Sequence, residues 1–279
     1  MNIFEASILG VVEGLTEFVP VSSTGHLILV GSALGLGGDP VLDQAVDAFD
    51  IVIQAGAWLA CVLYYLPLLR QRLRDLRDSD PVARRRGMHL IAGMAIAFVP
   101  VAVVGLIARK PIKELFFGPA PVAIALAVGG LVMIVADRWF ARRSRLTGLE
   151  HVSPRRALAI GAFQCFALVP GTSRSMATMV GGLIGGLDAR TAADFSFLLA
   201  IPVLGAATAY ELLKEWHVLV DHIGPAAIAT GLVTSFVVGW ASIAIFLRLI
   251  ERWGLVPFGV YRIVLAAVVW WALAGSAGG

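Results

Sequence analysis

The segment EGLTEFVPVSSTGH, residues 13–26, gathers acidic, hydroxyl and imidazole groups in an otherwise apolar region. Glu13 and Glu17 are four residues apart, so on a helix they share one face. An ionised carboxylate that faces lipid is very costly, and the pair must therefore face protein or water. Two close carboxylates can bind a divalent cation through their oxygens, or they can share a proton. A helix end at the membrane interface, with both acids solvated, is the structural alternative.

Three hydroxyl residues, Ser22, Ser23 and Thr24, follow the acidic pair. Their hydroxyls are candidate nucleophiles, but the same residue types are common helix N-caps that need no catalytic role. His26 comes next and can act as a base for a nearby hydroxyl or as an acid for a leaving group. A buried structural histidine is the alternative.

A second polar segment, PGTSRS, begins at Pro170. Gly171 allows a tight turn, and the N-terminus of the helix that follows can bind an anion. Arg174 lies far from both expected membrane faces, and its planar fork suits phosphate. A salt bridge from Arg174 to Glu13 or Glu17 is the structural alternative, and it would still bring the three together. The hydroxyl residues of this segment are Thr172, Ser173 and Ser175.

The composition is that of an integral membrane protein, because 58% of the 279 residues are hydrophobic and only 15% are charged. The net charge is +3, but the basic residues occupy short loops, so they indicate membrane orientation and no nucleic-acid partner. Cys61 and Cys165 lie in apolar stretches, and we expect neither a disulfide nor a Cys/His metal site. The start MNIFEASILG has no basic region or cleavage site, so no removable signal peptide is expected.

The hydropathy pattern divides the chain into long and short apolar segments. A helix needs about 20 apolar residues to cross the hydrocarbon core. Six segments meet this length: 47–68, 88–108, 119–139, 192–214, 224–249 and 255–277. Two regions do not, and each is a pair of short segments interrupted by VPVSST or VPGTSR: 2–18 with 24–36, and 157–169 with 175–187. Broken backbone at membrane depth must be buried in protein or line a wet cavity, so these pairs are predicted to be re-entrant hairpins.

The charges of the loops predict the topology. Residues 70–86 carry seven arginines and residues 138–156 carry six, so both loops are expected in the cytoplasm. Residues 36–50 and 215–223 lack Lys and Arg and are expected outside, and alternation also places 109–118 there despite its three basic residues. The first hairpin then inserts from outside and the second from the cytoplasm, with both termini outside.

The two halves resemble each other. TEFVPVSSTG and FALVPGTSRS align at Pro20 and Pro170, and each hairpin is followed by three spans. Insertion from opposite faces makes this an inverted repeat, whose site is expected near the midplane between the repeats. We therefore predict an all-α integral membrane protein with an inverted-topology repeat, six transmembrane helices and two re-entrant helical hairpins. It forms a single membrane domain, 1–279, with repeats at about 1–140 and 155–279.

Three segments carry a family resemblance: GVVEGLTEFVPVSSTGHLILVG, FDIVIQAGAWLACVLYY and LVPGTSRSMATMVGGLIGGL. Together they resemble the bacitracin-resistance family of undecaprenyl-diphosphate phosphatases over nearly the whole chain. The resemblance implies a homodimeric enzyme of the bacterial cytoplasmic (inner) membrane that depends on a divalent cation. It also implies removal of the terminal phosphate of the C55 lipid diphosphate, which recycles the carrier for peptidoglycan synthesis and gives resistance to bacitracin.

The family motifs fall on residues already singled out. The acidic motif falls on Glu13 and Glu17, and the Ser-Ser-Thr-Gly-His motif falls on residues 22–26. The Pro-Gly-x-Ser-Arg-Ser motif falls on residues 170–175. Met176 stands where the family usually has glycine, so the backbone after Arg174 is expected to be less free.

These residues suggest a mechanism. Arg174 and the N–H groups after the two prolines bind the diphosphate, while Glu13 and Glu17 hold Mg²⁺ or Ca²⁺. A hydroxyl then attacks the terminal phosphorus, with Ser23 the first candidate and Thr24 the second, and His26 assists proton transfer. The cavity is expected to open outward.

Two alternatives remain at this stage. Metal-bound water can attack directly, with Ser23 only binding the phosphate. A secondary transporter or lipid flippase with the same inverted repeat is the alternative function, in which the arginine and the acids carry an anionic head group.

Overall fold

The computed structural model describes residues 1–36, 40–116, 118–141 and 146–276, and the regular elements within them are helical. The six long helices among these residues are α3 (Pro40–Asp75), α4 (Pro81–Phe116), α5 (Pro119–Ala136), α8 (Ala189–His222), α9 (Pro225–Trp253) and α10 (Val256–Ser276). The four shorter α-helices are α1 (Ile3–Thr16), α2 (Ser23–Ala33), α6 (Pro154–Gln164) and α7 (Arg174–Ile184). Short helical turns are η1 (Asp137–Ala141), η2 (Leu149–His151) and η3 (Cys165–Leu168).

The six long helices match the predicted spans. Within the described ranges, six helices are long and apolar enough to cross a membrane, so the chain is a multi-pass membrane protein. Most extend beyond the predicted apolar stretch: α3, for example, continues to Asp75 rather than ending near residue 68. The extra turns carry Arg72 and Arg74. Charged side chains at a helix end remain in water, which explains why hydropathy alone underestimates the helix.

The four shorter helices form two pairs, α1 with α2 and α6 with α7, interrupted where the sequence predicted breaks. The first break runs from residue 17 to 22. In the second pair, η3 and residues 169–173 separate the two helices. α1 has 14 residues and is therefore about 21 Å long at 1.5 Å per residue, too short to cross a bilayer.

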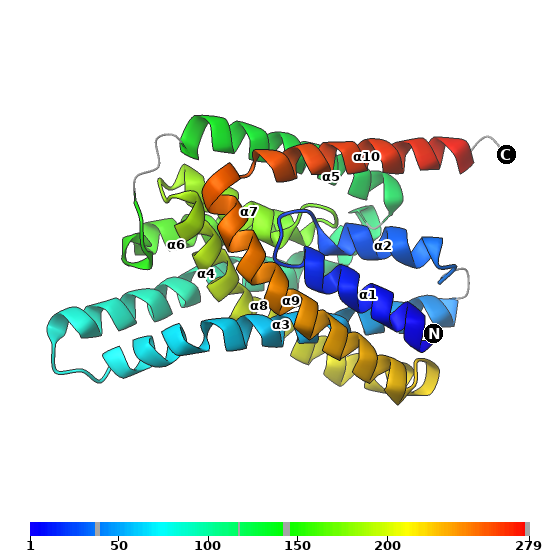
Figure 1. The fold of residues 1–279 in the computed structure, drawn as a ribbon, viewed down its shortest axis with the longest axis horizontal. Helices are drawn as coiled ribbons and strands as arrows, with labels where there is room; N and C mark the ends of the chain where they lie inside the picture. The colour runs from blue at the N-terminus through cyan, green and yellow to red at the C-terminus, as the bar shows by residue number, and fades with distance from the viewer. Residues whose placement is uncertain (37–39, 117, 142–145, 277–279) are drawn as a thin grey trace.

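The contacts between helices repeat from one half to the other. α1 packs on α9 and α6 packs on α4, so each first helix of a pair contacts the fourth α-helix of the opposite half. α5 and α10 lie side by side, and α3 contacts α8. The α3–α4 connection lies at one end of the molecule and the α8–α9 connection lies at the opposite end (Figure 1).

The contact between α1 and α9 depends on small residues. A β-carbon added to Gly14 would lie 2.8 Å from both the Gly239 nitrogen and the Ser235 carbonyl oxygen, so any larger residue would separate the helices. Gly10, one turn earlier, is equally close to the α9 backbone at Gly231. This spacing of small residues lets membrane helices approach closely, and it fixes the start of the first break.

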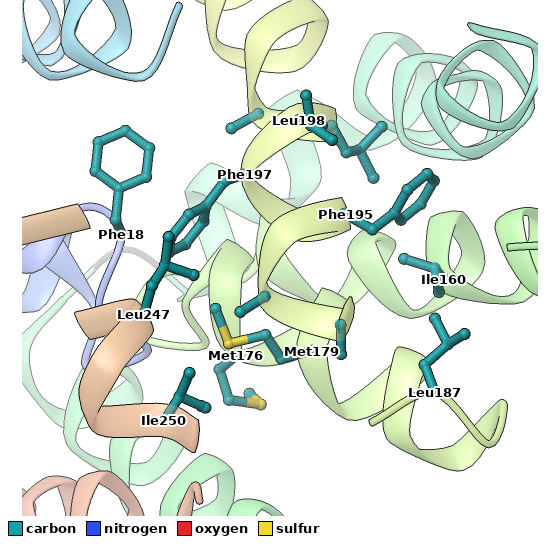
Figure 2. Close-up of a cluster of buried hydrophobic side chains, with 14 of the residues drawn as sticks. Phe18, Ile160, Met176, Met179, Leu187, Phe195, Phe197, Leu198, Leu247 and Ile250 are labelled. Carbon is teal, nitrogen blue, oxygen red and sulfur yellow. The ribbon is translucent and has the colours of Figure 1, made fainter. Parts of the chain in front are cut away.

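The main hydrophobic core surrounds the point where the two pairs meet (Figure 2). Phe18, the second residue of the first break, is fully buried and packs edge-on against Phe197 of α8, with 5.2 Å between ring centroids. Met176 of α7 belongs to the same core. The first break and the first turn of α7 are therefore each attached to the core by a buried side chain close to a predicted functional residue.

Candidate active site

The two breaks share an unusual backbone conformation. Ser22 has φ +75° and Ser173 has φ +72°, and within the described ranges they are the only non-glycine residues with positive φ. Each serine caps the next helix: Ser22 Oγ accepts from the Gly25 N–H at 3.4 Å and Ser173 Oγ accepts from the Met176 N–H at 3.3 Å. A non-glycine residue in this region costs free energy, and such residues cluster at functional sites.

This shared geometry corrects the internal alignment by one residue. The sequence pattern paired Pro20 with Pro170, whereas the two capping serines pair Pro20 with Gly171 and Ser23 with Arg174. The same offset pairs Glu13 with Gln164 at the ends of α1 and α6. The capping serine comes two residues after Pro20 but three residues after Pro170. Aligning the two prolines therefore put the two caps out of register by one residue.

The carboxylate of Glu17 joins the two breaks. Ser23 Oγ donates a hydrogen bond to Glu17 Oε2 at 2.7 Å. Arg174 Nη2 lies 3.3 Å from Glu17 Oε1, and both side chains of this ion pair are largely buried. The salt bridge anticipated as a structural alternative is thus present. It brings together a hydroxyl, a carboxylate and a guanidinium from residues up to 157 positions apart in the sequence.

Arg174 keeps one hydrogen-bond donor without a protein partner. Its Nη1 donates to the Ser196 carbonyl at 3.0 Å, and its guanidinium lies 5.9 Å from the centre of the Phe18 ring. Among the described residues, the buried Nε has no partner. Leaving a buried charged donor unpaired is costly, and an anion in the adjoining cavity would satisfy it.

Glu13 and Gln164 also hold unpaired polar atoms. Glu13 is 1% exposed, and its carboxyl group lies near that of Glu17, one helical turn away. Its Oε1 has no partner in the described part of the chain, and neither do the amide oxygen and nitrogen of the fully buried Gln164. Two buried carboxyl groups in contact require a proton or a cation between them.

The second break agrees with its predicted geometry. Gly171 has φ +89°, as a tight turn requires. Ser173 Oγ and Ser175 Oγ are 3.0 Å apart, and Ser175 Oγ donates to the Val19 carbonyl of the first break at 3.2 Å. The Thr172 N–H donates to a carbonyl of its own turn, so it is already used in the structure.

Met176 does not disturb the helix that follows Arg174. Its N–H is the donor to the Ser173 cap, and its side chain is buried in the main core. α7 begins regularly at Arg174. A methionine at this position therefore leaves the start of α7 regular.

A cavity of about 230 Å³ lies between the two breaks. Its lining includes polar residues and the glycine of the second break: Glu17, Ser22, Ser23, Thr24, Gln54, Gln164, Gly171, Ser173 and Arg174. The other lining residues are apolar: Val101, Ala167, Leu168, Val169, Pro170, Val203, Leu204 and Ala207. A lining of both kinds suits an amphiphilic ligand. A larger cavity of about 540 Å³, with Asp43, Asp47 and Asp50 in its wall, lies between α2 and α3 and contains none of the breaks' polar residues.

His26 is not among the residues that line the cavity of about 230 Å³ between the breaks. Its Nδ1 is 2.7 Å from the Ser22 carbonyl oxygen, and its Nε2 is 2.7 Å from the hydroxyl of Tyr261. Since a carbonyl only accepts, Nδ1 carries the proton and Nε2 accepts from Tyr261. The structure therefore brings Glu17, Ser23 and Arg174 together but engages both ring nitrogens of His26 elsewhere.

Arg262 of α10 was not singled out from the sequence. It is fully buried and donates to the carbonyl oxygens of Pro20 and Gly171, one from each break. Its signal in the sequence is an arginine inside an apolar segment of spanning length, where ionisable residues are rare and usually functional. Tyr261, beside it, has no comparable signal.

Comparison with known proteins shows the family of this chain. The family model described as bacitracin resistance protein BacA matches residues 6–268. The chain belongs to this family. A BacA relative from Sorangium cellulosum, named undecaprenyl-diphosphatase, is 51% identical over 271 residues, which cover 96% of this chain and 85% of the relative.

Two further relatives carry the same name. The relative from Persephonella marina is 44% identical over 270 residues, which cover 96% of this chain and 98% of the relative. The one from Nitratidesulfovibrio vulgaris, strain Hildenborough, is 42% identical over 273 residues, covering 98% and 99%. The resemblance to the bacitracin-resistance family is thereby confirmed over nearly the full length.

Proposed function

We propose that this protein is an undecaprenyl-diphosphatase, which hydrolyses undecaprenyl diphosphate to undecaprenyl phosphate and inorganic phosphate. The observation that carries the proposal is the contact of Ser23, Glu17 and Arg174 at a cavity whose lining includes both polar and apolar residues. The names of full-length BacA relatives support the same reaction. Transport of an anionic lipid, the other function considered from the sequence, has no such support.

The substrate head group binds beside Glu17, Ser23 and Arg174, and its prenyl chain contacts the apolar residues of the lining. Arg174 offers its unpaired Nε to a phosphate oxygen, a charge-assisted hydrogen bond. The hydroxyls of Thr172 and Ser173 in the second break and of Ser175 in the first turn of α7, together with the backbone at Gly171, complete the phosphate cradle. Ser22 takes the corresponding place at the start of α2.

The reaction begins at Ser23. Its Oγ attacks the terminal phosphorus while its proton passes to Glu17 Oε2, which already accepts it at 2.7 Å. The bond between the terminal phosphorus and the bridging oxygen breaks, and undecaprenyl phosphate leaves. Water then hydrolyses the phosphoserine and regenerates the hydroxyl. Thr24, which also lines the cavity, is the second candidate nucleophile.

His26 keeps a secondary role in this proposal. With Nδ1 bound to the Ser22 carbonyl and Nε2 to Tyr261, it orients the Ser22–Ser23 backbone in the resting state. Proton transfer to the leaving group by His26 requires its ring to turn away from Tyr261. Direct attack by water, with Ser23 only binding phosphate, is the competing route.

A divalent cation, Mg²⁺ or Ca²⁺, fits the residues present. Among the described residues, no group of three or more His, Cys, Asp or Glu side chains could hold a metal ion. Mg²⁺ is nevertheless commonly bound by one or two carboxylates together with substrate phosphate. Glu13, with its unpaired Oε1, and Glu17 supply those carboxylates. Bound there, the cation would neutralise charge on the phosphate.

We further propose that the helix pairs are re-entrant hairpins of an inverted repeat, with repeats at about 1–140 and 155–279. The reciprocal contacts α1–α9 and α6–α4 support this arrangement, as do the matching serine caps. The site then lies near the bilayer midplane. Polar, unpaired groups at that depth are tolerated because they line a cavity.

The proposed location is the bacterial cytoplasmic membrane, with the cavity open to the outer side. The arginine-rich connection between α3 and α4 supports a cytoplasmic position for that end. A homodimer in the lipid bilayer follows from the family resemblance. In this setting the enzyme recycles the lipid carrier for cell-wall synthesis and gives resistance to bacitracin.

The proposed function is tested by phosphate release from undecaprenyl diphosphate by the purified protein in detergent, with and without a chelator. Release that stops with chelator and returns with Mg²⁺ or Ca²⁺ is expected. Release that is indifferent to chelator would remove the cation from the proposal, and no release with any cation would contradict the function itself.

A further inference from the structure

Arg262 makes contacts unlike those of any other described arginine. Its side chain is fully buried, and no acidic residue in the described ranges forms an ion pair with it. Instead it donates four hydrogen bonds to backbone carbonyls. The acceptors are Leu126 (3.3 Å), Ala125 (3.1 Å), Pro20 (3.2 Å) and Gly171 (2.8 Å). A buried cation is tolerated only where its donors are satisfied, and this network satisfies them.

The two acceptors outside α5 occupy equivalent positions. Pro20 lies two residues before Ser22, and Gly171 lies two residues before Ser173. The two serines are the positive-φ caps of α2 and α7. One guanidinium therefore links the same point in both breaks.

The linked points lie just before the reactive groups. Ser23 is the first residue of α2, and Arg174 is the first residue of α7. Their meeting at Glu17 requires the two breaks to be held at a fixed separation. The Glu17–Arg174 ion pair, at 3.3 Å, is one tie between them, and Ser175 to the Val19 carbonyl is another. A substrate phosphate must compete with the Glu17 carboxylate for Arg174.

The neighbouring helices are shaped to hold this guanidinium. Gly129 of α5 has no side chain where the guanidinium lies, and a β-carbon there would overlap it. α5 and α10 lie side by side in Figure 1, so α5 supplies both the space and two of the four acceptors. Arg262 does not line the cavity between the breaks, and so has no direct route to a phosphate bound there.

We infer that Arg262 is a positioning residue for the proposed reaction: it holds the two breaks in register so that Glu17, Ser23 and Arg174 act on one phosphate. The inference rests on the proposed phosphatase function. Its test therefore includes a structural measurement that needs no turnover.

The test uses Arg262→Lys, which keeps the charge but cannot span four carbonyls with a planar fork. The turnover number should fall about tenfold or more, the loss expected for a charged hydrogen bond, while KM stays within about threefold because the prenyl contacts are intact. Gly129→Ala is the second variant. The added β-carbon displaces the guanidinium without removing it, so the turnover number and KM should change as they do in Arg262→Lys. The inference can therefore be tested even if Arg262→Lys does not accumulate as folded protein.

The distance between the breaks is measured separately. Spin labels at Ser32 of α2 and Phe166 of η3, both exposed, report on the two pairs in a background without Cys61 and Cys165. A narrow distance distribution in the parent protein should broaden in Arg262→Lys and in Gly129→Ala.

Arg156→Lys is the matched control. Arg156 also donates to backbone carbonyls, those of Gly185 and His151, but both acceptors lie outside the two breaks. This variant should keep the parent turnover number and distance distribution. Equal losses in Arg156→Lys and Arg262→Lys would overturn the inference. So would an unchanged turnover number in Arg262→Lys, or a reduced one with an unbroadened distribution. An inactive parent protein would instead contradict the proposed function.

Discussion

At the scale of the residue, Glu17 has two partners with different consequences. The ion pair with Arg174 is buried, and removing one member of such a pair leaves an uncompensated charge that destabilises the protein. The hydrogen bond from Ser23 aligns a hydroxyl with a base. Substitutions that change geometry while keeping charge, or that remove the hydroxyl alone, are therefore the simplest to interpret.

Arg174→Lys changes the geometry and keeps the charge. We expect it to lose about 2 kcal/mol or more of transition-state stabilisation, because lysine cannot offer two or three donors in one plane to phosphate and the Ser196 carbonyl. The measurement is kcat/KM for phosphate release from undecaprenyl diphosphate. Turnover close to that of the parent protein would show that Arg174 is structural and does not bind the transition state.

Glu13→Gln and Glu17→Gln test the carboxylates. If both hold the cation, each variant should raise the Mg²⁺ or Ca²⁺ concentration needed for half-maximal rate, because an amide is a weaker ligand for a hard cation. Glu5→Gln, on the same helix but in its N-terminal capping box, is the control and should leave the metal response unchanged. A lower rate with an unchanged metal response would assign the carboxylates to proton transfer alone.

The residues that could be predicted from the sequence are those in dense polar motifs. Glu17, Ser23 and Arg174 stand out because each is a costly group in an apolar segment, and the structure brings them together. Arg262 has a similar cost but no polar neighbours in sequence. Its partners are carbonyls of Pro20 and Gly171, which only the three-dimensional fold brings to it.

At the scale of the element, the proposed re-entrant arrangement of the helix pairs makes a prediction. Both ends of the first pair, at Asn2 and Ser32, should react from outside when replaced singly by cysteine. Both ends of the second, at Arg155 and Ile184, should react from the cytoplasm. The four side chains are exposed. The measurement is labelling of intact cells with an impermeant thiol reagent, before and after lysis, in a background without Cys61 and Cys165.

Reaction of the two ends of one pair from opposite faces would mean that this pair crosses the membrane. Reaction of all four sites from one face would remove the inverted repeat while leaving the hairpins. The labelling therefore tests separately whether each pair is a re-entrant hairpin and whether the two pairs insert from opposite faces.

Hydropathy predicted the elements well and their partners poorly. Spans of about 20 apolar residues can be recognised from the sequence, and so can breaks rich in proline and hydroxyl residues. The packing of α1 on α9 is different, because Gly14 indicates a close approach but not to which helix. The strained caps at Ser22 and Ser173 were also invisible, since serine at an N-cap ordinarily has extended backbone.

At the scale of the whole molecule, the ends of the long helices should lie on opposite faces of the membrane. Asp78, in the α3–α4 connection, is expected in the cytoplasm, and Asp221, near the end of α8, is expected outside. A single cysteine at Asp78 should react with an impermeant thiol reagent only after lysis, and one at Asp221 should react in intact cells. The reverse pattern would invert the molecule and open the cavity to the cytoplasm, against the excess of arginine near Asp78.

The halves of the molecule contribute different groups to one site, the nucleophile and base from the first break and the guanidinium from the second. Neither half contains a complete set. Effects of substitutions in the two breaks should therefore depend on each other, because residues that act as a unit are strongly non-additive.

The most direct test of the account is a double-mutant cycle on phosphate release, with Ser23→Ala, Arg174→Lys and the double variant. Ser23→Ala should lose at least ~10³ in rate if its hydroxyl attacks, and Thr24→Ala, the control, much less. A loss of only about 10- to 150-fold in Ser23→Ala would indicate a lost phosphate hydrogen bond and favour direct attack by water. In either case the double variant should be little slower than the slower single variant. Losses that multiply across the two breaks would contradict a single shared site.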